Sequence, residues 1–423
     1  METQNAIPGK QLPDSSCGVA QIPRAAYLHI PFCRRRCFYC DFPVSVVGDR
    51  RNGSNSGTIV KYVDQLCREI AITPIFNIPL QTIFFGGGTP SLLSVVQIDR
   101  LIEALADRFG IAAEAEISME IDPGTFDLAQ IQGYRTAGIN RVSLGVQSFA
   151  DDLLKACGRS HCVADIYAAV DLLHQAQIPN FSLDLISGLP HLTIDRWQKD
   201  LETAIDLQPH HLSIYDLTLE TGTVFDRYYQ AGANPLPTDE TSAQMYRLAQ
   251  QTLTAAGYEH YEISNYARPG YQCHHNRTYW ENRPYYGFGM GATSYTHGYR
   301  CTHPRKTGEY YQWLEEFIAA GGKLPGSPPP PNEVLLETLM LGLRLADGLD
   351  LEILARDWGS ETLDRIWRCL QPYAQQGWVE IIHSDETRTT AKTLPHSGRL
   401  RLSDPEGFLF SNTLLASLFR DLG

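Results

Sequence analysis

Three cysteines, Cys33, Cys37 and Cys40, lie within eight residues of one another. Soft thiolates at this spacing can hold an iron–sulfur cluster. A cubane has four irons, so three local ligands leave one iron without a cysteine, and such an open position is typical of a catalytic or substrate-binding site. Zinc is less favoured, because zinc knuckles pair Cys-x-x-Cys units or add histidine.

The composition limits the function classes that need to be considered. Seven of the ten cysteines are scattered, which is typical of small buried hydrophobes and does not form a disulfide framework. The first 24 residues are polar, and no segment approaches the roughly 18 apolar residues of a membrane span. The net charge of -13 disfavours non-specific binding to nucleic acid. We therefore expect a globular cytoplasmic protein without a nucleic-acid partner.

The elements that must position these cysteines are indicated by an alternation of short apolar runs and longer helical patterns. The strand-like runs are residues 26–30, 82–85, 116–121, 141–146, 181–186 and 211–217. The helix-like stretches between them include residues 60–73, 94–109, 163–177 and 193–207. Strands joined by helical crossovers are parallel and covered on both faces. The pattern predicts an α/β fold with a partial (β/α)6 barrel.

The loop residues directly after the predicted strands indicate where the functional site lies. The cysteine loop, which begins at Pro31, follows the first strand, and Gly- or Pro-marked loops follow three others, at residues 86–90, 122–123 and 188–190, while Gln147 and Ser148 follow a further strand. All of these loops fall at the carboxyl ends of parallel strands, where the loops of such folds converge on a ligand. We therefore expect one site on this rim.

The last part of the chain is predicted to be a separate small domain. A Pro- and Gly-rich linker precedes three helical patterns at residues 332–345, 351–357 and 361–376, and residues 377–381 and 400–402 alternate like a hairpin. This pattern indicates an α+β winged-helix-like domain. Its third helix lacks a basic run, which favours a packing or interaction role over DNA binding. The expected organisation is an N-terminal extension (1–24), the barrel (25–220), a barrel extension (221–322), the linker (323–331) and the C-terminal domain (332–423).

The residues around the three cysteines resemble those of a known protein family. The run from Tyr27 to Phe42 is similar to the cluster loop of radical S-adenosylmethionine (SAM) proteins. More narrowly, it resembles the family of oxygen-independent coproporphyrinogen III dehydrogenase (HemN) and the heme chaperone HemW. The resemblance implies that Cys33, Cys37 and Cys40 ligate a [4Fe–4S] cluster whose free iron is chelated by the amino and carboxylate groups of SAM.

Downstream motifs match the same family in order along the whole barrel. A glycine loop at residues 86–90 resembles the one that lies against the methionine part of SAM, and glycine permits this close backbone approach. The SAM contacts that the resemblance implies are Tyr27, Tyr39, Gly87, Gly88, Thr89, Glu120, Gln147, Arg159 and Asp184.

Three features favour the HemW side of this family. Dehydrogenases carry a fourth cysteine two residues after the third, where this chain has Phe42. Only 26 residues precede Tyr27, whereas the dehydrogenase has a longer N-terminal arm. Residues 275–280 contain the HemW signature His-Asn-x-x-Tyr-Trp.

The signature residues are candidates for heme binding, because an imidazole can ligate iron while aromatic faces cover the macrocycle. They are His275, the first choice for the axial ligand, with Asn276, Tyr279 and Trp280. Cys273 and His274 are alternative ligands, and a hydrogen-bonded brace is the alternative role for His275.

The resemblance implies a heme chaperone that binds heme, a [4Fe–4S] cluster and SAM and transfers heme to an acceptor protein. The alternatives are an oxygen-independent coproporphyrinogen III oxidase that uses a 5′-deoxyadenosyl radical, and a radical SAM enzyme with another substrate. The sequence leaves open a peripheral contact with a membrane.

Overall fold

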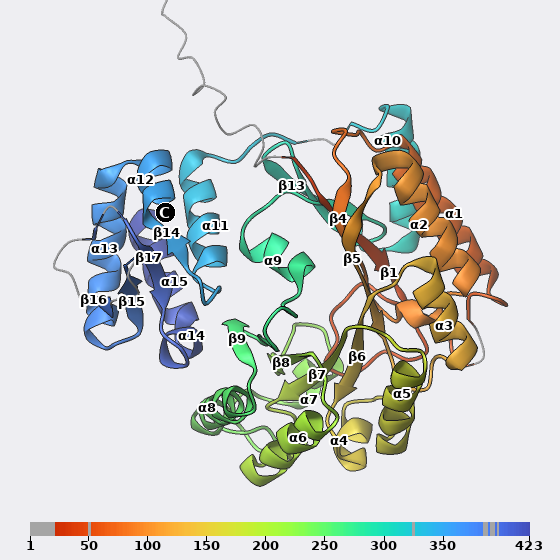
Figure 1. The fold of residues 1–423 in the computed structure, drawn as a ribbon, viewed down its shortest axis with the longest axis horizontal. Helices are drawn as coiled ribbons and strands as arrows, with labels where there is room; N and C mark the ends of the chain where they lie inside the picture. The colour runs from red at the N-terminus through yellow and green to blue at the C-terminus, as the bar shows by residue number, and fades with distance from the viewer. Residues whose placement is uncertain (1–21, 50–51, 324–325, 384–387, 390–393, 396) are drawn as a thin grey trace, which may run out of the picture.

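The computed structural model describes residues 22–423 apart from 50–51, 324–325, 384–387, 390–393 and 396. The predicted N-terminal extension therefore lies almost entirely outside the described residues. The described chain forms a large α/β unit and a smaller C-terminal unit at its side (Figure 1).

The six predicted strands are confirmed, and neighbours along the chain pair in parallel. They are β1 (Ala25–Ile30), β4 (Leu80–Gly87), β5 (Ile111–Ile121), β6 (Arg141–Gln147), β7 (Phe181–Ser187) and β8 (His211–Asp216). All seven residues of β6 are buried, because a strand in such a sheet is covered on both faces. This burial explains why the strands appear in the sequence as continuous apolar runs.

Helices cover the outer face of the sheet (Figure 1). They are α1 (Gly57–Ile72), α2 (Val95–Phe109), α3 (Leu128–Ala137), α4 (Asp151–Ala156), α5 (Val163–Gln175), α6 (Ile194–Asp206) and α8 (Asp239–Ala255). The four predicted helices among them are confirmed to within three residues at each end. At the start of α2, Ser94 and Gln97 form a reciprocal capping box that fixes where the helix begins.

The sheet is wider than predicted, with the order β11-β1-β4-β5-β6-β7-β8-β10-β9. The added strands are β9 (Glu259–Glu262), β10 (Asn265–Ala267) and β11 (Tyr286–Phe288). Only β11 runs parallel to its neighbour β1, whereas β10 pairs antiparallel with β8. Strands of three or four residues are too short to show a period in the sequence, so the prediction missed them. Because β11 and β9 end this sheet, the barrel is open in the described part of the chain.

The remaining elements of the barrel region are short or lie in the extension. They are β2 (Phe32–Cys33), β3 (Ser45–Val46), the 3-10 helix η1 (Pro90–Leu92), α7 (Val224–Tyr228), α9 (His274–Trp280), β12 (Thr293–Thr296), β13 (Tyr299–Thr302) and α10 (Thr307–Ala319). In Figure 1, α9 lies on the open side of the barrel, between β4 and the C-terminal unit, and it packs against β4.

The C-terminal unit contains the three predicted helices, α11 (Pro331–Gly342), α12 (Leu351–Trp358) and α13 (Ser360–Gln375). The predicted two-stranded wing is part of a four-stranded sheet, and two further helices follow it. These elements are β14 (Leu349–Asp350), β15 (Val379–Ile382), β16 (Arg388–Thr389), β17 (Arg399–Leu402), α14 (Glu406–Leu409) and α15 (Ser411–Leu422). The unit has its own apolar core, to which α15 contributes Leu414 and Leu418.

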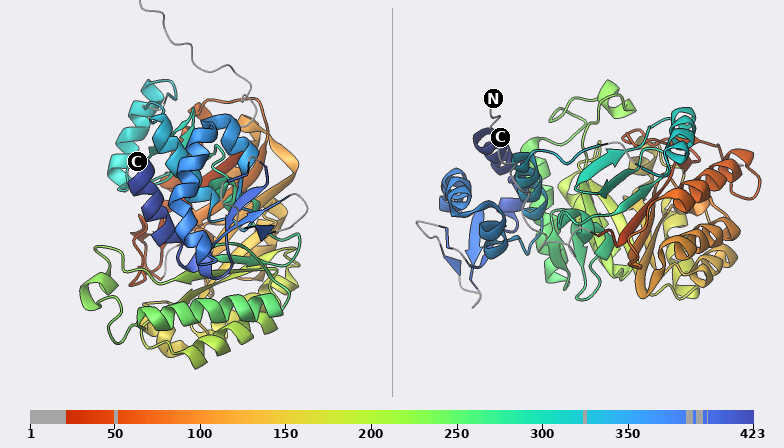
Figure 2. Two further views of the ribbon diagram at one scale, coloured as in Figure 1. Left: turned by 90° about the vertical axis from the view of Figure 1, so that its left-hand side faces the viewer. Right: turned by 90° about the horizontal axis from the view of Figure 1, so that it is seen from above.

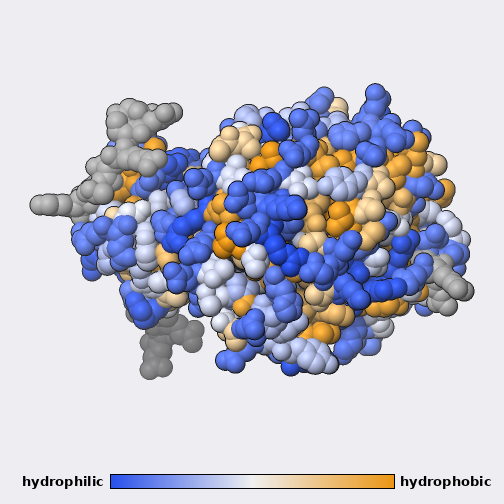
Figure 3. All heavy atoms as spheres, turned by 90° about the horizontal axis from the view of Figure 1, so that it is seen from below, coloured by the Kyte–Doolittle hydropathy of each residue, from blue (hydrophilic) through white to orange (hydrophobic). Residues whose placement is uncertain are grey.

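Polar contacts join the C-terminal unit to α8 and β9, and the two units lie side by side in the right-hand view of Figure 2. Arg247 Nε lies 2.6 Å from Glu406 Oε1, and His260 Nδ1 lies 2.8 Å from Asp404 Oδ1. Hydrophobic residues are scattered among hydrophilic ones over the face drawn in Figure 3. Among the helices of the described residues, none combines the length and apolarity that crossing a bilayer requires.

Candidate cofactor site

A cavity of about 470 Å³ opens at the carboxyl ends of the parallel strands. Cys33, Cys37 and Cys40 all line it, together with residues of β7 and of the loops after β4, β5, β6 and β8. Loops far apart in the sequence therefore meet at one place, as the strand order predicts.

Backbone hydrogen bonds hold the cysteine loop over this cavity. The short strands β2 and β3 pair, which places Cys33 beside Val46. Farther along, Phe38 N donates to Cys157 O at 2.9 Å, and Cys40 N donates to Cys37 O at 3.3 Å. The loop is thus fixed at its start and its middle, which orients three thiols toward the same space.

The donor set at this mouth, three cysteine thiols lining one cavity, fits an iron–sulfur cluster in its chemistry. Burial raises the pKa of Cys33 to about 12, with further contributions from Asp122 and the neighbouring thiols, and it also raises the pKa of Cys40. A cation must therefore replace the protons for the sulfurs to act as thiolates. A Cβ at Gly88 would lie 2.8 Å from Ile30 O, and one at Gly145 would lie 2.7 Å from Asp122 Oδ1, so the cavity depends on glycine.

Eight of the nine predicted SAM-contacting residues line this cavity. They are Tyr39, Gly87, Gly88, Thr89, Glu120, Gln147, Arg159 and Asp184. Tyr27 does not line it, since its side chain lies farther inside the barrel. Its hydroxyl is 3.0 Å from His29 Nδ1, and its ring stacks on Phe84 with centroids 6.2 Å apart.

Two half-buried carboxyl groups line the cavity as hydrogen-bond acceptors. Glu120 Oε2 accepts from Gly87 N at 2.9 Å, and burial raises the pKa of Glu120 to about 8, with Asp184 and Asp122 contributing. Asp184 accepts from Ser143 Oγ at 2.8 Å and 3.0 Å, and burial raises the pKa of this carboxyl too. Both groups can accept hydrogen bonds from an ammonium group or from ribose hydroxyls.

Asp122 has a role that was not predicted from the sequence, where it stands only as the residue after a strand. Its carboxylate accepts from Thr89 Oγ1 at 2.9 Å and forms an ion pair with Arg159. Burial by itself would lower the pKa of Arg159, but Asp122 and other nearby groups raise it well above its ordinary value. The only sequence signal was that Asp122 directly follows the predicted strand and stands two residues after Glu120, a spacing that favours one face.

The predicted heme residues on α9 do not converge on this cavity. His275 is fully buried inside the barrel, with Nδ1 2.8 Å from Thr82 Oγ1 and Nε2 2.8 Å from Tyr279 Oη. Burial lowers the pKa of His275 to about 3. Both ring nitrogens have partners, so this conformation is that of a hydrogen-bonded brace, and ligation of iron would need one hydrogen bond to break.

The other residues of this segment lie in different environments. Cys273 is buried, with Sγ 3.5 Å from Glu116 Oε1, whereas His274 is exposed and Asn276 is half-buried. Trp280 faces the C-terminal unit, where the Arg344 guanidinium lies 5.7 Å from its ring centroid. It lines a groove of about 510 Å³ between the two units, together with residues of α11 and α12.

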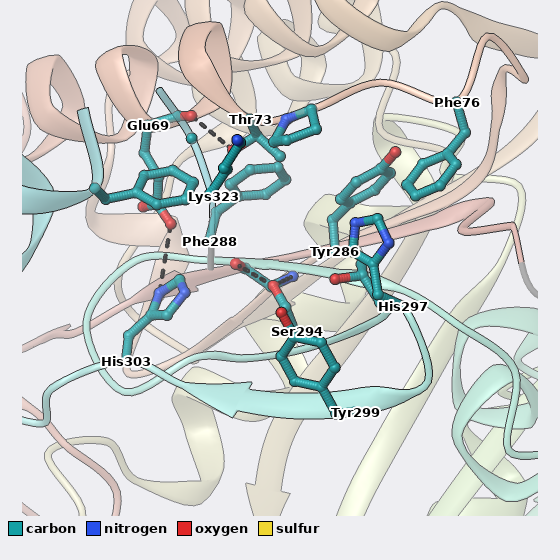
Figure 4. A pocket seen from close by; sticks show the side chains of 15 residues that line it. Glu69, Thr73, Phe76, Tyr286, Phe288, Ser294, His297, Tyr299, His303 and Lys323 are labelled. Atoms are coloured by element: carbon teal, nitrogen blue, oxygen red, sulfur yellow. Dashed lines mark hydrogen bonds and ion pairs between the residues drawn. The ribbon is translucent and has the colours of Figure 1, made fainter. Parts of the chain in front are cut away.

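A smaller cavity of about 220 Å³ lies between α1, α10 and the β11–β13 segment (Figure 4). Glu69 and His303 point toward one another at one end of it, with Oε1 and Nδ1 3.4 Å apart. Burial raises the pKa of Glu69 to about 8 and lowers the pKa of His303 to about 4. Glu69 Oε2 also accepts from Gly289 N at 3.0 Å and Tyr310 Oη at 2.6 Å, so this network ties α1 to the segment after β11.

Comparisons with known proteins agree with this geometry. Residues 27–204 match the model of the radical SAM superfamily, and residues 330–385 match that of the HemN C-terminal domain. A relative named heme chaperone HemW from Synechocystis sp. is 48% identical over 410 residues, which cover 96% of this chain and 98% of that protein. Its Bacillus subtilis counterpart is 33% identical over 387 residues, covering 89% of this chain and 96% of that protein.

One solved structure shares most of the fold. The coproporphyrinogen III oxidase HemN from Escherichia coli, a radical SAM enzyme, matches with a TM-score of 0.76 over 94% of this chain and 90% of that chain. The two sequences are 22% identical, so this likeness concerns the fold.

Proposed function

We propose that this chain, which belongs to the radical SAM superfamily and within it to the HemW family, is a heme chaperone that binds heme and passes it to an acceptor protein. The observation that carries the proposal is the 48% identity to a heme chaperone over 96% of this chain. That similarity includes the barrel, the His-Asn-x-x-Tyr-Trp segment and the C-terminal unit. Phe42, where dehydrogenases have a fourth cysteine, supports the same assignment.

Membership of the radical SAM superfamily implies a [4Fe–4S] cluster and SAM. We assign the cluster to Cys33, Cys37 and Cys40, and SAM to the cavity that these residues share with Glu120 and Asp184. When bound, the cluster supplies one-electron chemistry beside SAM. The chain supplies binding and orientation: the two carboxyl groups accept hydrogen bonds, and glycine residues allow close approach to the backbone.

We place heme at α9, which carries the signature residues. His274 is exposed and could ligate iron without rearrangement, whereas His275 could do so only after Tyr279 or Thr82 gives up its hydrogen bond. Trp280 offers an aromatic face on another side of α9, in the groove between the two units. We further propose that the protein acts in the cytoplasm and that the heme acceptor is a protein.

The test is an anaerobic titration of the cluster-loaded protein with heme, followed by absorbance, with and without SAM. The proposal predicts saturable binding at one heme per chain and no turnover of coproporphyrinogen III. Repeated conversion of coproporphyrinogen III to protoporphyrinogen IX would establish the oxidase instead. Absence of any spectral change at stoichiometric heme, together with no conversion, would favour a radical SAM enzyme with another substrate.

A further inference from the structure

A buried arginine donates a hydrogen bond to one of the clustered cysteines. Arg159 Nη1 lies 3.3 Å from Cys37 Sγ. The same guanidinium donates through Nη2 to Gly145 O at 3.0 Å and forms an ion pair with Asp122. The side chain of Arg159 is only 8% exposed, so water screens its charge weakly.

Asp122 is the group that fixes this guanidinium. One carboxylate oxygen faces Arg159, and the other accepts from Thr89 Oγ1 at 2.9 Å. Thr89 Oγ1 also lies 3.7 Å from Cys33 Sγ, but a hydroxyl has one proton, and the shorter contact with Asp122 is the better bond. A chain of contacts therefore runs from Thr89 through Asp122 and Arg159 to Cys37.

We propose that Asp122 is a positioning residue that holds Arg159 against the Cys37 sulfur and thereby sets the reduction potential of the cluster. The inference rests on the proposed function only in taking the three cysteines as cluster ligands. Reduction adds an electron to the cluster, and a positive donor beside a ligand sulfur stabilises the more negative form. Arg159 in this position therefore raises the potential.

This role differs from the SAM contact that the family resemblance implies for Arg159. If the guanidinium only paired with the carboxylate of SAM, its removal would weaken SAM binding and leave the potential of the SAM-free cluster unchanged. If it acts on Cys37, the potential changes when SAM is absent. The two roles can therefore be separated in one preparation.

The experiment is a redox titration of the cluster in SAM-free protein, monitored by electron paramagnetic resonance. Arg159→Met should move the midpoint potential to a more negative value. Asp122→Glu keeps the charge but displaces the carboxylate by one methylene, so it should move the potential in the same direction by less. Thr89→Val, which removes the hydrogen bond that orients Asp122, should give the smallest shift.

Asp216→Glu is the matched control. Asp216 is an exposed acid at the edge of the same cavity that accepts a hydrogen bond from Ser187, and the substitution should leave the potential at the wild-type value. Equal potentials in wild type, Arg159→Met and Asp122→Glu would overturn the inference while leaving the cluster assignment intact. A wild-type protein that binds no iron or sulfide would instead contradict the cluster assignment itself. If Arg159→Met fails to assemble a cluster, the other two variants decide.

Discussion

The barrel mouth and α9 assemble their polar residues in opposite ways. At the mouth, residues that are up to 187 positions apart, from Cys33 to Glu220, line one cavity. On α9, residues that are adjacent in the sequence separate: His275 and Tyr279 face the barrel interior, and Trp280 faces the C-terminal unit.

The difference follows from backbone geometry. Parallel strands deliver the residues after their carboxyl ends to one rim, whatever the spacing in the sequence. An α-helix completes one turn every 3.6 residues. Residues that are four positions apart therefore share a face of the helix, and the residue after the second of them points in another direction. His275 and Tyr279 are four apart and in contact, and Trp280 is one residue farther. A contiguous motif on a helix therefore need not form a single site.

The largest effect is expected at the mouth. Cys33→Ala removes one of the three cysteine ligands of the cluster. The protein should then bind no iron or acid-labile sulfide, because two thiolates are too few to hold the cluster. Iron and sulfide per chain provide the measurement, and circular dichroism checks the fold. Cys162→Ala, at an exposed cysteine, is the control and should keep full iron content. Retention of iron in Cys33→Ala would contradict the ligand assignment.

The next effect concerns SAM binding and its dependence on pH. Burial raises the pKa of Glu120 to about 8, so the carboxyl is mostly neutral at lower pH and must lose its proton to pair with an ammonium group. SAM affinity should therefore rise about tenfold per pH unit as pH approaches about 8, and level off above it.

Glu120→Gln should bind SAM more weakly and with no such slope, as measured by isothermal titration of cluster-loaded protein. Glu114→Gln, at an exposed acid of the same strand, serves as the control for general charge effects and should retain the wild-type slope. An unchanged pH profile in Glu120→Gln would show that another group accepts from SAM.

A smaller effect is expected inside the barrel. His275→Ala removes the hydrogen-bond partner of the buried Thr82 Oγ1 and of the half-buried Tyr279 Oη. The free energy of unfolding should fall by about 2 to 4 kcal/mol. Urea denaturation measures this change. His274→Ala, at the exposed neighbour, should change it by less than about 0.5 kcal/mol. Similar small losses in both variants would mean that His275 does not brace the barrel.

The smallest effect is expected on the other side of α9. Trp280→Leu removes the ring beneath the Arg344 guanidinium and should lower the unfolding free energy by about 1 kcal/mol, since the side chains are half-buried. The change should appear in the thermal transition. A loss as large as that of His275→Ala would place Trp280 among the residues that determine the barrel's stability.

The location of the cavity at the carboxyl ends of the strands could be predicted from the sequence, because strand order and loop position suffice to place it. The six parallel strands followed from hydrophobic periodicity, and the family resemblance supplied the nine SAM contacts, eight of which line the cavity. The prediction failed for residues whose role depends on the direction in which the side chain points. The burial of His275 depends on Thr82, which is 193 positions away, and the role of Asp122 depends on Thr89 and Arg159. The strands β10 and β11 were missed because three residues carry no readable period.

The measurement that most directly tests the separation of the two regions is the affinity for heme of the cluster-free protein. Anaerobic titration of Cys33→Ala with heme, beside the cluster-loaded wild type, compares the two dissociation constants. If heme binds at α9 and the cluster at the mouth, the constants should agree within about threefold. Loss of heme binding together with the cluster, in a variant that keeps its circular dichroism spectrum, would contradict the account.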